Sequence, residues 1–102
     1  MVHISLEKAR EIGDKLKINF TVISPSIWKK GMVVELEHGK RYKESNITND
    51  DLLVTGKIVL AHLFEYPDYY ERLERMEKTA EKYWKGKRKP SVRISTRKTI
   101  KK

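Results

Sequence analysis

The sequence predicts a small all-α protein: a four-helix domain with a short irregular connection after the first helix and a basic, flexible C-terminal tail. Apolar residues recur at spacings of three and four in four separate segments. A serine, threonine or proline stands at the start of each segment, as is typical of helix N-termini. With 102 residues the chain is long enough for one domain. We therefore expect a compact helical domain over residues 1–85 and a tail over residues 86–102.

The first helix is expected to begin after Ser5, whose hydroxyl can accept a hydrogen bond from a free backbone N–H of the first turn. One apolar stripe along this helix comprises Leu6, Ala9, Ile12 and Leu16. An irregular connection, residues 17–23, should follow. Its apolar side chains, which we expect to fill the core, are Ile18, Phe20 and Val22.

The second helix is expected to begin at Ser24 and Pro25, because serine caps a helix and proline fits its first position. It should run to about His38, where Gly39 would provide a left-handed stop. A polar loop, residues 39–47, then leads to the third segment.

The third helix is expected to run from about Asn49 to Glu65. Thr48 and Asp51 resemble a capping box in which aspartate replaces the usual glutamate. Its residues are apolar on more than one side, and this pattern is typical of a buried helix. We therefore expect the third helix to be the central and most buried one.

The fourth helix is expected to begin at Pro67, which cannot continue the preceding helix, and to run to about Trp84. Acidic and basic residues alternate on its outer face and can form ion pairs at a spacing of four. The side chains that we expect to face inward are Tyr70, Leu73, Met76, Ala80 and Tyr83.

Two glutamate–histidine pairs suggest a polar site between the second and third helices. Glu35 and His38 are three residues apart, as are His62 and Glu65, so each pair shares one helix face. If these helices pack antiparallel, the four side chains could meet and bind Zn, Fe or Mn through nitrogen and oxygen ligands. Buried polar groups are more often simply hydrogen-bonded. We therefore expect a structural cluster without a cofactor, with a metal site and acid–base chemistry without a metal as the two alternatives.

The C-terminal tail holds the whole excess of positive charge. The net charge is +9, and residues 85–102 contain nine Lys or Arg and no Asp or Glu, whereas the other 84 residues hold 14 basic and 14 acidic residues. Such a tail can neutralise phosphates, which predicts binding to nucleic acid or a nucleoprotein surface. An acidic protein, an anionic membrane and a merely solubilising role are the alternatives. The cations of this predicted contact are Lys85, Lys87, Arg88, Lys89, Arg93, Arg97, Lys98, Lys101 and Lys102.

The absence of cysteine and the short apolar segments indicate where in the cell the protein is expected. The chain has no cysteine, so it has neither disulfides nor a thiolate metal site. Its N-terminus lacks the basic and apolar regions of a signal peptide. The longest apolar run, near residues 58–64, is far shorter than the ~20 residues of a membrane span. We expect an intracellular or virion-associated protein that is not secreted.

Several segments together resemble a small family of uncharacterised proteins found in phages, prokaryotes and large DNA viruses. The similar segments are 31–39 (GMVVELEHG), 46–51 (NITNDD), 55–63 (TGKIVLAHL), 65–70 (EYPDYY) and 72–77 (RLERME). The resemblance implies a viral or virus-like context, and the family brings no established activity.

The function expected from these observations is that of a non-enzymatic binding or structural protein. Its helical body would dock on a protein partner, and its tail would contact a nucleic acid or a nucleoprotein assembly, such as a virion or a ribonucleoprotein. The alternative is a metal-binding protein, including a metal-dependent enzyme, that uses Glu35, His38, His62 and Glu65.

Overall fold

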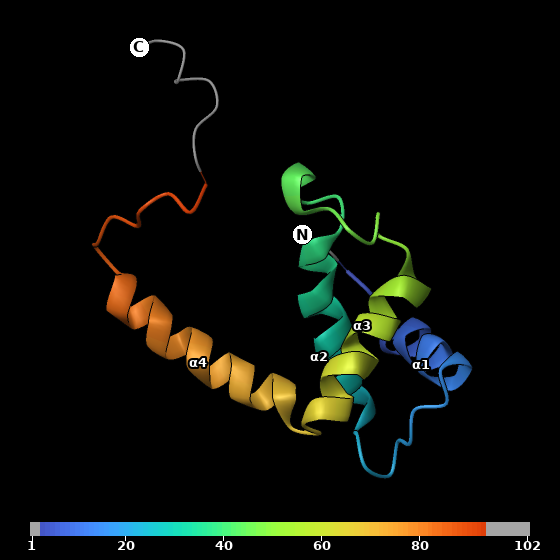
Figure 1. The fold of residues 1–102 in the computed structure, drawn as a ribbon. Coiled ribbons are helices and arrows are strands. Elements are labelled where there is room, and N and C mark those ends of the chain that lie inside the picture. The colour runs from blue at the N-terminus through green and yellow to red at the C-terminus, as the bar shows by residue number, and fades with distance from the viewer. Residues whose placement is uncertain (1–2, 94–102) are drawn as a thin grey trace.

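The computed structural model describes residues 3–93 and confirms the all-α fold class. Its four α-helices are α1 (Leu6–Lys15), α2 (Pro25–Glu35), α3 (Leu52–Glu65) and α4 (Tyr69–Trp84), and the described residues contain no strand. Two short 3₁₀ turns, Leu36–His38 and Lys43–Ser45, lie between α2 and α3. Helices α1, α2 and α3 pack into a compact body, and α4 projects away from it (Figure 1).

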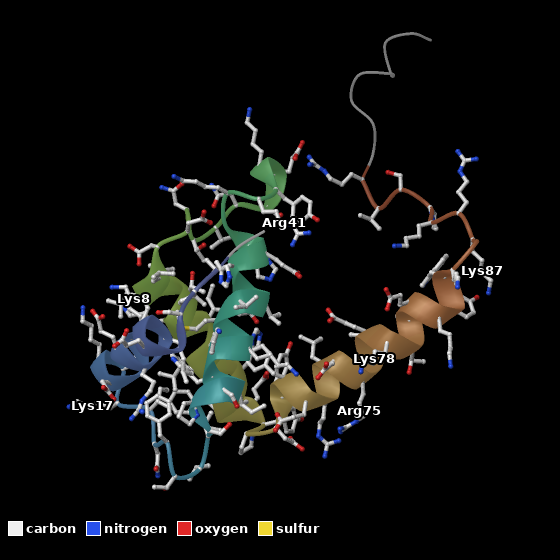
Figure 2. All side chains as sticks on the ribbon, turned by 180° about the vertical axis from the view of Figure 1, so that it is seen from behind. Lys8, Lys17, Arg41, Arg75, Lys78 and Lys87 are labelled. Carbon is white, nitrogen blue, oxygen red and sulfur yellow. The ribbon has the colours of Figure 1, made fainter. Side chains whose placement is uncertain are left out.

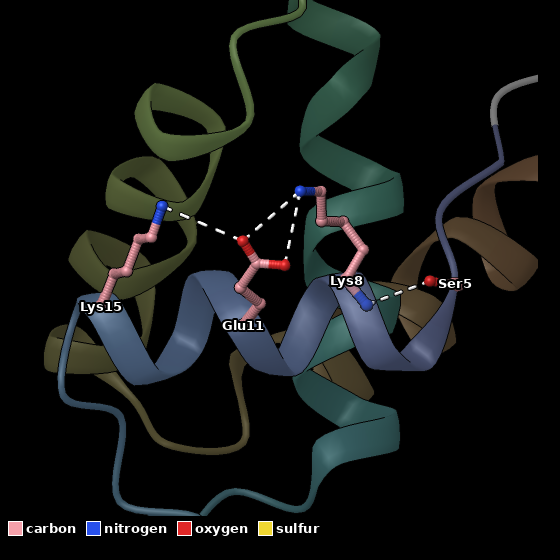
Figure 3. A network of polar contacts seen from close by, with 4 residues as sticks. All are labelled: Ser5, Lys8, Glu11 and Lys15. Carbon is pink, nitrogen blue, oxygen red and sulfur yellow. Dashed lines mark hydrogen bonds and ion pairs between the residues drawn. The ribbon is translucent and has the colours of Figure 1, made fainter.

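Helix α1 begins where the sequence predicts. Ser5 Oγ accepts a hydrogen bond of 3.0 Å from the backbone N–H of Lys8, and Glu11 lies between Lys8 and Lys15 on the outer face (Figure 3). Ala9 and Ile12 are buried as expected. Leu6 was expected to share their stripe but is 45% exposed, because it occupies the first position of the helix at the edge of the body.

The connection between α1 and α2 forms a series of turns. Ile18 and Phe20 pack against the core as predicted. The expectation for Val22 was wrong, because its side chain is 64% exposed. The backbone N–H groups of Val22 and Ile23 both bond to the carbonyl of Asn19, and this turn buries Ile23 in place of Val22.

Helix α2 has the predicted Ser24 cap and Pro25 start, and it tightens into a 3₁₀ turn at Leu36–His38. Gly39 is not the left-handed stop that the sequence predicted, because its φ is −101°. Asp50 and Thr48 instead press against it, and a Cβ at this position would overlap the Asp50 carboxylate. Glycine is therefore required at position 39 because the side chains of Asp50 and Thr48 approach its backbone closely.

Helix α3 begins at Leu52, later than the predicted start near Asn49. Asn49 and Asp50 have φ values of 53° and 62°, which no α-helix accommodates. The cap is Asp51 itself, whose carboxylate accepts a hydrogen bond of 2.9 Å from Val54 N. Thr48 is buried and accepts from Asp50 N, so the predicted capping box is not formed.

Helix α2 is the central helix, which corrects the expectation for α3. It contacts α1, α3 and α4. Its Trp28 and Met32 are fully buried, and the Trp28 indole N–H donates a hydrogen bond of 2.7 Å to the carbonyl of Ala9. In α3 several apolar residues lie outside the buried face: Leu53, Val54 and Phe64 are 38%, 39% and 79% exposed.

Helix α4 leaves the body after Leu73 and Glu74, which still contact it. It begins at Tyr69, after Pro67, with Asp68 as the residue before the first turn. Tyr70 is buried as predicted, but Met76 and Tyr83 are 55% and 59% exposed, so their predicted inward orientation was wrong. The radius of gyration of 16.6 Å exceeds the about 13 Å of a compact domain of this length. No helix among residues 3–93 is long and apolar enough to cross a membrane.

Candidate functional site

A buried carboxylate joins the elements of the body to α4. Glu35, the last residue of α2, is only 2% exposed. Its Oε2 accepts a hydrogen bond of 2.7 Å from the Tyr70 hydroxyl of α4 and lies 3.0 Å from Nδ1 of His62 in α3. His62 Nδ1 also lies 3.1 Å from the Tyr70 oxygen. We call Glu35, His38, His62, Tyr69 and Tyr70 the junction cluster.

The hydrogen bonds of the junction cluster assign the proton on His62. Tyr70 has one hydroxyl proton, and it is directed at Glu35. An unprotonated Nδ1 would then set a lone pair against two oxygen acceptors at 3.0 and 3.1 Å. Nδ1 therefore carries a hydrogen, which it donates to the Tyr70 oxygen beside Glu35 Oε2, and Nε2 is the His62 nitrogen left for other contacts.

The second carboxylate oxygen of Glu35 faces a different side chain. Glu35 Oε1 is buried and has no hydrogen-bond partner among the described residues. His38 Nε2 lies 3.4 Å from it, on the 3₁₀ turn that follows α2. The side chain of His38 is 48% exposed, so this edge of the cluster reaches solvent.

Two tyrosines cover the histidine. The Tyr69 ring stacks on the His62 ring with centroids 4.3 Å apart and planes 2° from parallel. Burial raises the pKa of Tyr70, and its hydrogen bond to Glu35 raises that pKa further. Burial also raises the pKa of Tyr69, with a further contribution from the negative charge of Glu35. Both hydroxyls therefore stay protonated above the usual range of tyrosine.

The predicted four-residue metal set is only partly assembled. Glu35 lies beside both His38 and His62, which contact different oxygens of its carboxylate, but Glu65 is exposed at the end of α3. Within residues 3–93, no three or more His, Asp or Glu side chains are grouped so that they could hold a metal ion. The place expected for Glu65 is taken by Tyr70, which the sequence indicated only as a core residue. Binding of Zn, Fe or Mn stays a prediction that metal analysis of the purified protein can test.

The predicted tail contacts begin at the far end of α4. Lys85, Lys87, Arg88, Lys89 and Arg93 are exposed, and none of them forms an ion pair with another described residue. The Lys87 ammonium lies over the Tyr83 ring, 3.5 Å from its centroid. Figure 2 shows Arg75 and Lys78 along α4 and Lys87 beyond its end, away from the body. The remaining predicted contacts, Arg97, Lys98, Lys101 and Lys102, lie outside the described residues.

Comparison with known proteins identifies a family whose function is unknown. The family described as a protein of unknown function (DUF5661) matches residues 9–79, which include the whole junction cluster and all but the last part of α4. No curated protein and no solved structure is significantly similar to this chain. The match ends before the cationic segment that begins at Lys85.

Proposed function

The chain belongs to this family of proteins of unknown function, and we propose from its own residues that it is a non-enzymatic binding or structural protein. Its basic tail contacts nucleic acid or an anionic nucleoprotein assembly, and its helical body docks on a protein partner. A virion or a ribonucleoprotein is the setting that fits this combination, in agreement with the viral context implied by the sequence resemblance.

The observation that carries this proposal is the separation of charge from the body. The first 84 residues are neutral overall, whereas the cations from Lys85 onward have no acidic neighbours in the sequence. Helix α4 holds the start of this cationic segment away from the body (Figure 1). A cationic segment that projects from the body reaches a polyanion without bringing the acidic side chains of the body against it.

The junction cluster supports this function as a mechanical anchor. Helix α4 contacts the body through its first residues, and Tyr70, with its hydrogen bond to Glu35, is the buried one among them, so the direction of α4 depends on this side chain together with Leu73 and the Lys30–Glu74 ion pair. Buried hydrogen bonds to a charged acceptor are among the stronger ones in proteins. The cluster therefore fixes where the tail is presented, which is a structural task and involves no reaction.

The body has an apolar pocket that suits a protein partner. A pocket of about 250 Å³ lies between the connection that follows α1 and the end of α3. Val22 and Phe64, both strongly exposed, line its rim. Exposed apolar side chains around a concave surface are typical of protein contact sites.

Truncation tests the tail. Removal of residues 86–102 should leave the helical circular dichroism and the melting temperature unchanged, because these residues follow the last helix. The truncated protein should lose salt-sensitive binding to fluorescein-labelled single-stranded and duplex oligonucleotides, measured by fluorescence anisotropy beside the full-length chain. An unchanged affinity after truncation would overturn the proposal.

A further inference from the structure

Helix α4 carries an apolar stripe that the body leaves uncovered. Its residues follow one another at spacings of three, four and three, which is the pattern of a coiled-coil seam: Leu73, Met76, Ala80 and Tyr83. Leu73 is partly buried against the core, whereas Met76 and Tyr83 are 55% and 59% exposed. The stripe therefore faces solvent over the part of α4 that projects from the body.

Charge divides the two edges of this stripe by sign. At about 100° per residue, two charged side chains lie directly beside the seam, Glu77 on one edge and Arg72 on the other. Farther round the helix, the side of Glu77 carries Glu74 and Glu81, and the side of Arg72 carries Arg75 and Lys82.

We propose that the apolar stripe of α4 pairs with the same stripe of a second copy of this chain, with the two helices parallel. A two-fold axis along the helices sets the acidic edge of each copy against the basic edge of the other, on both sides of the seam. An antiparallel pair would set acidic against acidic and basic against basic. Charge complementarity therefore selects both the partner and the direction.

The register of this pair follows from one charged couple. Arg72 precedes Glu77 by five residues, which is the spacing at which charged side chains beside the seam bridge parallel helices. Arg72 is exposed, and its one ion pair within the described residues is with the exposed Asp68, so its side chain is accessible to the partner. In the dimer, Arg72 of each copy contacts Glu77 of the other, and the couple occurs twice.

The contacts that attach the body to α4 lie near the start of this helix. They are the hydrogen bond of Tyr70, the packing of Leu73 against the core and the ion pair between Glu74 and Lys30 of α2, so Met76, Ala80 and Tyr83 lie beyond them along the helix. The 16 residues of α4 supply only about two heptads, so the seam is small beside standard protein interfaces. The dimer is therefore reversible and depends on protein concentration.

Parallel pairing has a consequence for the tails. Both basic segments leave the dimer at the same end, so two tails can contact one polyanion, and the second contact is intramolecular. This consequence rests on the proposed nucleic-acid contact, whereas the dimer itself does not. The dimer is therefore tested on the protein alone.

Disulfide crosslinking tests the direction, because the chain has no cysteine of its own. Single-cysteine variants Met76→Cys and Tyr83→Cys should both form disulfide-linked dimers on mild oxidation. In an antiparallel pair, the 1.5 Å rise separates at least one of these positions from its copy by about 10 Å along the axis. The control is Lys78→Cys, on the opposite face of α4 and 75% exposed, which should stay monomeric. Crosslinking at one position only, or equally at residue 78, contradicts the parallel pair.

Charge reversal tests the pairing without oxidation. Sedimentation of the full-length chain in low-salt buffer should show a monomer–dimer equilibrium. Arg72→Glu and Glu77→Arg should each raise the dissociation constant by about tenfold, since each replaces two attractive contacts by two repulsive ones. The double variant should restore the original dissociation constant. A monomer at all concentrations overturns the dimer, and a double variant as weak as the single variants overturns the register.

Discussion

Tyr70 donates a hydrogen bond of 2.7 Å to the buried carboxylate of Glu35, and this bond joins the start of α4 to the end of α2. It is the closest polar contact of the junction cluster. The Tyr70 ring also packs against Gly31, so this one side chain attaches α4 to the body both by apolar packing and by a hydrogen bond. The position of the basic tail therefore depends on a residue far from it in space.

Loss of the Tyr70 hydroxyl should destabilise the fold. Tyr70→Phe keeps the ring but leaves Glu35 without its best donor, and such a bond to a charged group contributes about 1.5–3 kcal/mol. The melting temperature should fall by on the order of 10 °C for a domain of this length. Tyr69→Phe is the matched control, because it keeps the stacking on His62. Chemical denaturation of both variants measures the difference, and equal stabilities would contradict the role of the Tyr70 bond.

Stability should fall at alkaline pH because of the same two tyrosines. The pKa values of Tyr69 and Tyr70 are raised in the folded protein, so the unfolded chain releases these protons first. Their contribution is complete below pH ~10 and is lost as the pH rises toward the folded pKa values. The slope per tyrosine reaches about 1.4 kcal/mol per pH unit. Tyr70→Phe should show a shallower decline than the unchanged chain in urea unfolding above pH ~10, and parallel curves would rule out this origin.

Gly31→Ala should destabilise the protein although alanine favours helices. A Cβ at this position would lie 2.8 Å from Val59 Cγ1 and 2.9 Å from Tyr70 Cε2. Such overpacking costs about 1–3 kcal/mol, which exceeds the gain of about 1 kcal/mol in helix propensity. Thr79→Ala, at an exposed position of α4, is the control and should change the free energy of unfolding by no more than about 0.5 kcal/mol. A Gly31→Ala variant that is more stable than the unchanged chain would show that α4 is held loosely.

Local chemistry explains why part of the fold was predictable. The caps at Ser5 and Ser24 and the start at Pro25 depend on neighbouring residues, and the structure confirms them. The stripe of α4 is equally clear in the sequence, but periodicity shows only that a face is apolar and not what covers it. Met76 was therefore assigned to the core although the body does not reach it.

The candidate site, too, was predictable from the sequence only in part. Helical spacing identified Glu35, His38 and His62 as side chains that could meet, and their contacts agree with this expectation. Tyr70 was missed as the partner of Glu35 because its place depends on the turn at Pro67, which returns the chain toward α2. The seven residues between His62 and Tyr70 gave no periodic signal for that return.

Binding to nucleic acid should weaken with salt in proportion to the cations that touch phosphate. Each contact contributes about 0.7–0.9 to the slope of log affinity against log salt concentration. Replacing four exposed tail cations by glutamine should therefore lower the slope by about three, as measured by anisotropy titrations at several salt concentrations. The tail set is Lys85, Lys87, Arg88 and Lys89, and the control set of exposed body lysines is Lys15, Lys40, Lys43 and Lys57. Both variants lose the same net charge, so a general effect of net charge would lower both slopes equally. A loss confined to the tail set would identify direct phosphate contacts, because only those release counterions one for one.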